Sequence, residues 1–249
     1  MIFLISKKFS LCLALLFLAN ILCCNSSPEN NTAKFATSVD APLSLPTPWD
    51  GFECSDKWKI TGYFTPVETE YPASPTEKIK ITQEFSSSNG KYVDINISEK
   101  FSKEFLKLIY DKESCDKYIN GNTDFDCGEG FGKTKFGWYL GGFVEKKKWI
   151  WIKSDAPLGD RDNVLDLNTI AVTIDENSNK IPRDSLVKIP DLPLPYNTKI
   201  FSVKDVGLSV GEKQIDIYCG EGKSAEQETF KITRLESNEL VKVCYKKSN

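Results

Sequence analysis

The second half of the chain consists of short β-type segments, and this pattern is what most restricts the fold. Each segment is rich in β-branched or aromatic residues and is bounded by Pro, Gly or Asn, as strands between turns are. Trp58–Val67, which stops at Pro66, has the same character. Six such strands are enough to close a small barrel, so the sequence predicts a mainly β domain. The five later segments are Thr169–Ile174, Ser185–Ile189, Lys199–Val203, Gln214–Tyr218 and Leu240–Tyr245.

The first half predicts two strands around a turn, and then a helix. Large apolar side chains recur at helical spacing after Ser98, which can cap the start of this helix. We expect its aromatic face to lie in the core and the helix to end near Tyr110. The expected elements are strands at Ile79–Phe85, Tyr92–Ile97 and Trp149–Ile152, a turn at Ser86–Gly90, the helix with Phe101, Phe105, Leu108 and Ile109 on its buried face, and a short helix at Ser224–Phe230.

The chain has 249 residues and no histidine, which removes many catalytic designs. There can be no Ser-His-Asp triad, no Cys-His pair, no His-ligated zinc and no histidine general base. Any catalysis must rest on Asp, Glu, Lys, Tyr, Ser or Cys. The formal net charge of −3 provides no broad positive field for DNA or RNA, so we expect no nucleic-acid partner.

Residues 1–24 have the pattern of an export signal. Two lysines precede an apolar run at 9–22 that is short for a membrane span, and polar residues follow at once. Cys23 or Cys24 stands where bacterial lipoprotein signals carry the lipid-modified cysteine, so lipidation of one of them is one expectation. Residues 25–50 would then form a flexible tether. The alternative is a short membrane anchor that is retained.

Five cysteines lie downstream of the signal: Cys54, Cys115, Cys127, Cys219 and Cys244. An oxidising compartment favours disulfides, and we expect pairs Cys115–Cys127 and Cys219–Cys244, with Cys54 left over. Spacing alone does not fix these pairs. No C-x-x-C spacing occurs among them, so neither a structural zinc site nor a redox pair is indicated.

The glycine-rich stretch Gly128–Thr134 ends in Gly-Lys-Thr, as a phosphate-binding loop does. Such a loop needs its first glycine five residues before the second, and Cys127 occupies that position. The residues after it do not begin an apolar helix either. We therefore reject nucleotide binding, and the sequence signals no metal and no organic cofactor.

Asp175, Asp205 and Asp216 are the candidate acidic residues of the β-rich part. Asp175 and Asp205 lie beside turns, where aspartate is common. Asp216 lies within the strand Ile-Asp-Ile-Tyr, an environment that disfavours a carboxylate. If Asp216 faces the barrel core, it must be paired or have a raised pKa. The alternative is that strand alternation points it to solvent while the isoleucines on both sides face the core.

Several stretches, in order, resemble a known family. Three of them read IPRDSLVKI at 181–189, VKDVGLSVG at 203–211 and QIDIYCG at 214–220. They resemble the three-aspartate domain of bacterial cell-wall proteins, which is also the catalytic core of the membrane-bound lytic transglycosylase A family. Upstream, TGYFTP at 61–66, the glycine-rich stretch and APLG at 156–159 look like earlier landmarks of that family. The turn residues Leu208, Ser209 and Val210 depart from its usual pattern.

The resemblance implies a double-psi β-barrel built from 51–68 and 127–249, with an inserted α+β segment at 69–126. It implies an enzyme that cleaves the β-1,4 bond between N-acetylmuramic acid and N-acetylglucosamine in peptidoglycan. The 6-hydroxyl of the sugar, and not water, closes on the anomeric carbon, so the product carries a 1,6-anhydro ring. One carboxyl group can then act first as acid and later as base. Peptidoglycan glycan strands are the expected partner, with membrane contact only through a lipid anchor.

By this resemblance Asp216 is the catalytic acid and base, and Asp205 is the residue that orients and tunes it. A nearby Asp205 carboxylate and an apolar strand environment would both raise the pKa of Asp216. The expected substrate-binding residues are Tyr63, Phe64, Asp175, Gly207 and Tyr218. Two alternatives stay open. One is a non-catalytic lipoprotein that binds peptidoglycan or another glycan, which the altered turn favours, and the other is a surface adhesin.

Overall fold

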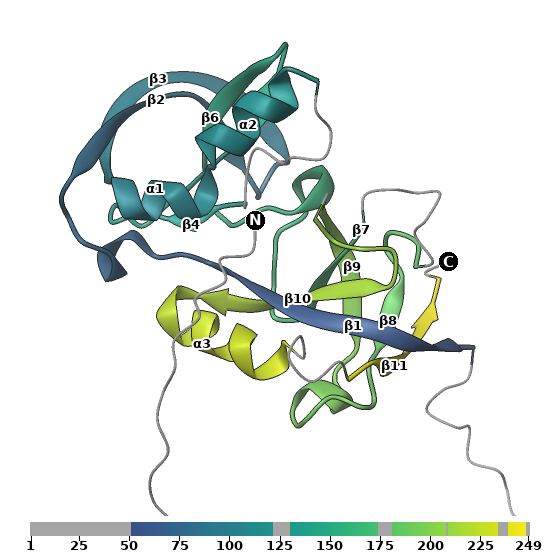
Figure 1. Cartoon of the computed structure of the whole chain (residues 1–249). Coiled ribbons are helices and arrows are strands. Elements are labelled where there is room, and N and C mark those ends of the chain that lie inside the picture. The colour runs from purple at the N-terminus through teal and green to yellow at the C-terminus, as the bar shows by residue number, and fades with distance from the viewer. Residues whose placement is uncertain (1–50, 122–129, 174–180, 208, 234–238, 248–249) are drawn as a thin grey trace, which may run out of the picture. The chain divides into compact units, whose positions relative to one another are not determined.

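The computed structural model describes residues 51–121, 130–173, 181–207, 209–233 and 239–247, all within one compact unit. Strands dominate this part of the chain, so the prediction of a mainly β fold is confirmed (Figure 1). Among the residues with described structure, no helix is both long and apolar enough to cross a bilayer. The predicted signal and tether, residues 1–50, lie outside the described residues. The elements are β1 (Glu53–Thr65), η1 (Glu68–Glu70), β2 (Thr76–Ser86), β3 (Lys91–Ser102), α1 (Lys103–Ile109), α2 (Lys112–Ile119), β4 (Gly132–Lys133), β5 (Tyr139–Glu145), β6 (Lys148–Ser154), η2 (Asp160–Asp162), β7 (Thr169–Thr173), β8 (Leu186–Lys188), η3 (Tyr196–Thr198), β9 (Phe201–Gly207), β10 (Gln214–Glu221), α3 (Gly222–Ile232) and β11 (Val241–Lys246).

The strands of the second half join β1 in a closed barrel with the order β1-β10-β7-β9-β8-β11. The sheet closes because β1 pairs in parallel with β10 on one side and antiparallel with β11 on the other. All six strands were expected from their β-branched and aromatic content. Alternate side chains point inward and form the core, which contains Trp58, Ile60, Ile170, Val172, Val187, Phe201, Val203, Ile215, Ile217, Val241 and Val243.

Helix α3, which was expected at 224–230, packs against β1 and β10 (Figure 1). Gly62 in β1 makes this contact close. A Cβ atom at Gly62 would lie 2.8 Å from Ile232 Cδ1 and 3.0 Å from Thr229 Cα. The glycine of the TGYFTP stretch is therefore required for packing, because only the absence of a side chain lets the helix approach the strand.

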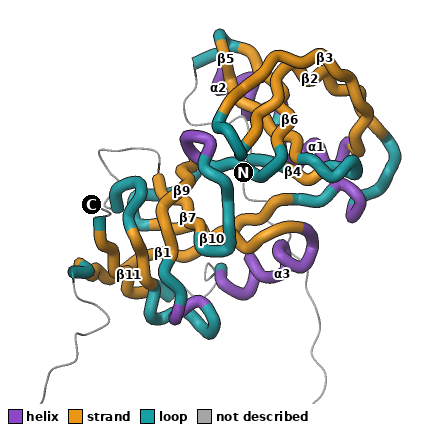
Figure 2. The backbone as a smooth tube through the Cα atoms, turned by 180° about the vertical axis from the view of Figure 1, so that it is seen from behind, coloured by secondary structure: helices purple, strands orange, loops and turns teal. Residues whose placement is uncertain are grey.

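A second sheet has the order β3-β2-β6-β5-β4, with β2 and β3 forming a long curved hairpin beside α1 (Figure 2). The hairpin and its turn agree with expectation. The sheet continues to Ser154, however, well past residue 126, the predicted end of the insertion. The reason is long-range pairing: β6 joins the edge of β2 in parallel, with Gln83 opposite Ile152.

The predicted helix begins later than expected. Residues 98–102 belong to β3, because β2 pairs with β3 up to Thr76 opposite Ser102. The cap is therefore Ser102 and not Ser98, and its Oγ accepts a hydrogen bond from Phe105 N. The stripe of Phe101, Phe105 and Ile109 is fully buried, as predicted. Strand pairing overrode the helical spacing over this first turn.

The predicted disulfide between Cys219 and Cys244 is wrong. Cys54 and Cys244 lie directly opposite each other in the β1–β11 pair and form a disulfide, with their Cα atoms 3.9 Å apart. Cys219 is a free thiol. Cys115 is also disulfide-bonded, and its predicted partner Cys127 lies outside the described residues. The pairing depends on which strands close the barrel, which cysteine spacing does not reveal.

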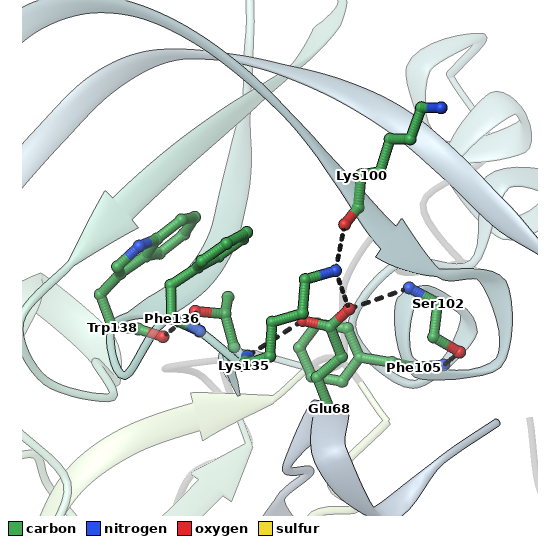
Figure 3. Close-up of polar contacts among 8 residues, drawn as sticks. Glu68, Lys100, Ser102, Phe105, Lys135, Phe136 and Trp138 are labelled. Atoms are coloured by element: carbon green, nitrogen blue, oxygen red, sulfur yellow. Dashed lines mark hydrogen bonds and ion pairs between the residues drawn. The ribbon is translucent and has the colours of Figure 1, made fainter. Parts of the chain in front are cut away.

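A buried carboxylate ties η1 to the second sheet (Figure 3). Glu68 is 5% exposed, and its Oε1 accepts hydrogen bonds from Ser102 N at 3.1 Å and Lys135 Nζ at 3.2 Å. Its Oε2 accepts one from Lys135 N at 3.0 Å. Lys133 pairs with Glu221 at 2.8 Å. Both lysines beside the Gly-Lys-Thr stretch are therefore engaged with carboxylates within the protein.

We expect Glu68→Ala to lower the free energy of unfolding by ~3 kcal/mol, because it leaves two buried backbone N–H groups and one ammonium without their acceptor. Urea unfolding followed by tryptophan fluorescence measures this. Glu84→Ala is the matched control: it breaks the more exposed Glu84–Lys153 pair, where a loss of at most ~1 kcal/mol is expected. Equal losses in the two variants would contradict the role of Glu68.

Candidate functional site

Four residues form a row across neighbouring strands of the barrel. Asp216 in β10 lies opposite Thr61 in β1 and opposite Ala171 in β7, and Ala171 lies opposite Asp205 in β9. Directly opposed residues in a sheet point to the same face. Asp216 and Asp205 therefore share one face of the barrel wall, about two strand spacings or ~10 Å apart at their Cα atoms. This is the face opposite the apolar core, since Ile215 and Ile217 point inward.

An irregularity in β9 turns Asp205 to this face. Phe201 and Val203 point into the core, so strict alternation would send Asp205 inward as well. The register shifts at this point, because Ile170 pairs with Val203 and Ala171 pairs with Asp205. The extra residue is Lys204. Such a bulge reverses which side chains face outward, and here it places Asp205 on the face of Asp216.

Asp216 is half-buried, and one of its carboxylate oxygens is held in place. Oδ1 accepts a hydrogen bond from Thr61 Oγ1 and another from Gln214 Nε2 at 2.9 Å. Gln214 Nε2 also donates to Thr61 Oγ1 at 3.0 Å. Among the described residues Oδ2 has no partner, and it is not a fully buried atom. The carboxyl group is thus fixed through one oxygen while the other stays open to a ligand.

Burial raises the pKa of Asp216, and the bonds from Thr61 and Gln214 offset part of this increase. The predicted direction is therefore correct. The predicted contribution from Asp205 is absent, since Lys59 is the charged group that acts on Asp216, and it lowers the pKa. Desolvation, and not a neighbouring carboxylate, favours the protonated form of Asp216.

Asp205 is held by the loop that contains η2. Its Oδ1 accepts hydrogen bonds from Asp160 N at 3.1 Å and from its neighbour Val206 N at 2.9 Å. Gly159 makes this approach possible, because a Cβ atom there would lie 2.9 Å from Lys204 O and 3.0 Å from Asp205 Cγ. Burial raises the pKa of Asp205 to about 6 despite these bonds and an interaction with Tyr63.

Tyr63 lies two residues after Thr61, on the same face of β1, opposite Tyr218. The two tyrosine rings pack with centroids 5.3 Å apart. Tyr218 is 3% exposed, and its hydroxyl shares a 2.8 Å hydrogen bond with Thr65 Oγ1. Tyr218 also lines a pocket of about 600 Å³ at the end of β10, together with Tyr139, Asp166, Cys219 and Glu221.

The structure does not bring the other predicted residues to Asp216. Phe64 follows Tyr63, so strand alternation points it to the opposite face of β1. Gly207 lies at the end of β9, where a Cβ atom would come within 2.8 Å of Val210 Cγ2, so packing accounts for the glycine. Asp175, Cys23 and Cys24 lie outside the described residues. No group of three or more Cys, Asp or Glu side chains among the described residues is arranged to hold a metal ion.

Sequence reasoning missed four residues that hold the two carboxyl groups: Thr61, Gln214, Gly159 and Asp160. Thr61 and Gly159 belong to stretches that we matched to family landmarks, so a signal for them existed. Gln214 could have been found by strand spacing, since a residue two positions before Asp216 shares its face. Nothing in the sequence indicates that the backbone N–H of Asp160 reaches Asp205.

The raised pKa of Asp205 makes stability depend on pH. Its folded pKa, about 6, is above the ordinary value of 3.8, so protonation stabilises the folded state. That contribution is present below pH 3.8 and is lost as pH rises through 6. We expect the free energy of unfolding of Asp205→Asn, relative to wild type, to increase by ~3 kcal/mol between pH 4 and pH 8. Urea titrations at several pH values measure it, and a difference that does not change with pH would contradict the assignment.

Comparison with known proteins finds distant structural likenesses only. No protein-family model matches the chain, and no curated protein matches its sequence. Among solved structures, the chain is similar to E. coli MltA with bound chitohexaose, at 13% identity and a TM-score of 0.40, covering 78% of this chain and 73% of that one. It is also similar to MltA from Neisseria gonorrhoeae, at 11% identity and a TM-score of 0.35, covering 77% and 72%. A third likeness is to the lytic transglycosylase LtgG of Burkholderia pseudomallei, at 11% identity and a TM-score of 0.33, covering 78% and 71%.

Proposed function

We propose that this chain is a lytic transglycosylase that cleaves the β-1,4 bond between N-acetylmuramic acid and N-acetylglucosamine in peptidoglycan. The observation that carries the proposal is the state of Asp216. Its carboxyl group is fixed through Oδ1, open at Oδ2, and desolvated enough to raise its pKa. A carboxyl group of this kind can donate a proton to a leaving oxygen. The ordered family stretches supply the substrate class.

In the proposed reaction, the proton on Asp216 Oδ2 passes to the glycosidic oxygen as its bond to the anomeric carbon of the muramic acid breaks. The 6-hydroxyl oxygen of the same sugar then forms a bond to that carbon. Its proton returns to Asp216, so the carboxyl group ends as it began. The leaving sugar keeps the first proton as a hydroxyl group, and no water is consumed. Asp205, when ionised, supplies negative charge on the same face as positive charge builds up on the sugar ring.

The remaining features fit this role as parts of the same proposal. The barrel would be of the double-psi type, and the chain would act in the cell envelope after export. The Cys54–Cys244 disulfide fits an oxidising compartment. Cys23 or Cys24 would carry a lipid, with residues 25–50 as the tether to the barrel. Tyr63, Tyr218 and the pocket beside Tyr218 would contact the glycan strand.

One observation favours the second candidate, a glycan-binding protein without activity. Asp205 does not act on the charge of Asp216, so the expected mutual support of the two carboxyl groups is missing. The two candidates differ in what happens to the glycan. A binding protein would retain peptidoglycan fragments without changing their mass.

The test is digestion of isolated peptidoglycan by the purified protein, with mass spectrometry of the released fragments. The proposal expects fragments with 1,6-anhydro ends, each one water lighter than the corresponding hydrolysis product. Fragments with reducing ends would indicate a hydrolase and would refute the proposed reaction. Co-sedimentation with peptidoglycan and no release of fragments would support the binding protein instead.

A further inference from the structure

The hydroxyl group of Tyr63 is a buried polar atom without a hydrogen-bond partner among the described residues. Buried polar groups in native proteins are nearly always hydrogen-bonded, so such an atom calls for an explanation. Tyr218, the aromatic neighbour of Tyr63, has a satisfied hydroxyl. Tyr196, on the other side of the barrel core, donates its hydroxyl to Glu228 at 2.9 Å. The open hydroxyl thus belongs to the tyrosine on the face of the two carboxyl groups.

The position of Tyr63 explains what its hydroxyl could serve. Tyr63 is on the same face as Thr61, one step along from the row of Asp216, Ala171 and Asp205. The single methyl group of Ala171 leaves room between the two carboxyl groups. The hydroxyl of Tyr63 feels the charges of both, Asp205 more strongly than Asp216, and its own pKa is raised well above the ordinary value, chiefly by burial. It therefore remains a proton donor at neutral pH.

The groups that face Asp205 come from three elements. Asp160 in η2 adds negative charge that raises the pKa of Asp205, while the N–H groups of Asp160 and Val206 lower it. Tyr63 in β1 is the side chain that lowers it. Arg183 is engaged with Asp160 at 2.6 Å. Within the described residues, Tyr63 is thus the side-chain donor on hand for the carboxylate of Asp205.

We propose that Tyr63 is a positioning residue of this site, whose hydroxyl donates a hydrogen bond to Asp205 in the working state and keeps that carboxyl group ionised. The inference rests on the proposed function for the use of the charge. An ionised Asp205 supplies the negative charge that stabilises the sugar at the moment of bond cleavage. In the structure the hydroxyl is near Asp205 without a closed hydrogen bond, as is common for catalytic contacts before substrate binds.

The test is a titration of Asp205 in the complete, folded protein, followed through the ¹³C signal of its carboxyl carbon. The signal is assigned by its loss in Asp205→Asn. We expect the midpoint of Asp205 to rise by about one pH unit in Tyr63→Phe, because the donor is removed while the ring remains. Tyr196→Phe is the matched control, since it deletes a hydroxyl bonded to Glu228, and it should leave the midpoint unchanged.

An unchanged midpoint in Tyr63→Phe would overturn the inference. A shift of the same size in Tyr196→Phe would also overturn it, since the effect would then not be local. The titration needs no substrate, so this failure is distinct from failure of the proposed function. If peptidoglycan is cleaved, the acid limb of the pH profile of kcat/KM should move to higher pH in Tyr63→Phe by the same interval, with the alkaline limb in place.

Discussion

Asp216→Asn should abolish the release of anhydro-ended fragments, lowering kcat by ~10³-fold or more. The amide keeps the hydrogen bonds from Thr61 and Gln214 in part and fills nearly the same volume, but it cannot donate and recover a proton. General acid–base groups typically contribute factors of 10²–10⁴. Fragment release from peptidoglycan, quantified by mass spectrometry, measures the loss. Binding of the variant to peptidoglycan should persist, because the fold and the open face remain.

Asp94→Asn is the matched control for this substitution. Asp94 also lies within a strand, β3, but it is exposed and belongs to the second sheet. Its variant should cleave at the wild-type rate. If Asp216→Asn kept more than a tenth of the wild-type rate, Asp216 could not be the acid, and the proposed reaction would have to be abandoned.

The pH dependence of the wild type should follow the same logic. The reaction needs Asp216 with its proton, and burial raises the pKa of that group above the ordinary value. Activity should therefore fall as pH rises through the folded pKa of Asp216. It should also fall on the acid side as Asp205 becomes neutral near its pKa of about 6. The two limbs together give a bell-shaped profile.

Removal of the Cys54–Cys244 disulfide is expected to cost ~4 kcal/mol of stability. The bond joins positions 190 residues apart, so it restricts the unfolded chain over most of its length. It also links β1 to β11, the pair that closes the barrel. The double variant Cys54→Ser, Cys244→Ser should unfold at a lower urea concentration, and circular dichroism should follow the loss of strand signal.

Cys219→Ser is the control for the change from thiol to hydroxyl, because Cys219 is a free, half-buried cysteine. It should cost ~1 kcal/mol or less. Reductant alone is a weaker test, since it also acts on the disulfide of Cys115. If the double variant were as stable as Cys219→Ser, the disulfide would contribute little and the closure of the barrel would depend on packing alone.

The strands were predictable from the sequence because their signal is local. In β10, Ile215 and Ile217 alternate with polar residues, and in β1 Trp58 and Ile60 do the same, so each strand records which face is buried. The stretch at 98–102 was misjudged because helical spacing and strand alternation compete over so few residues, and pairing with Thr76 decided the outcome. The cysteine pairing failed for a related reason, since it depends on which strands become neighbours.

The sequence by itself determined that Asp216 stands in a strand with its neighbours facing the core, and that any chemistry must proceed without histidine. Only the tertiary structure decided that Asp205 shares its face. A bulge at Lys204 reverses the alternation of β9, and the loop of Gly159 and Asp160 then covers Asp205 and raises its pKa. The physical reason is that alternation is a property of one strand, whereas register and desolvation arise only when distant strands pair and pack.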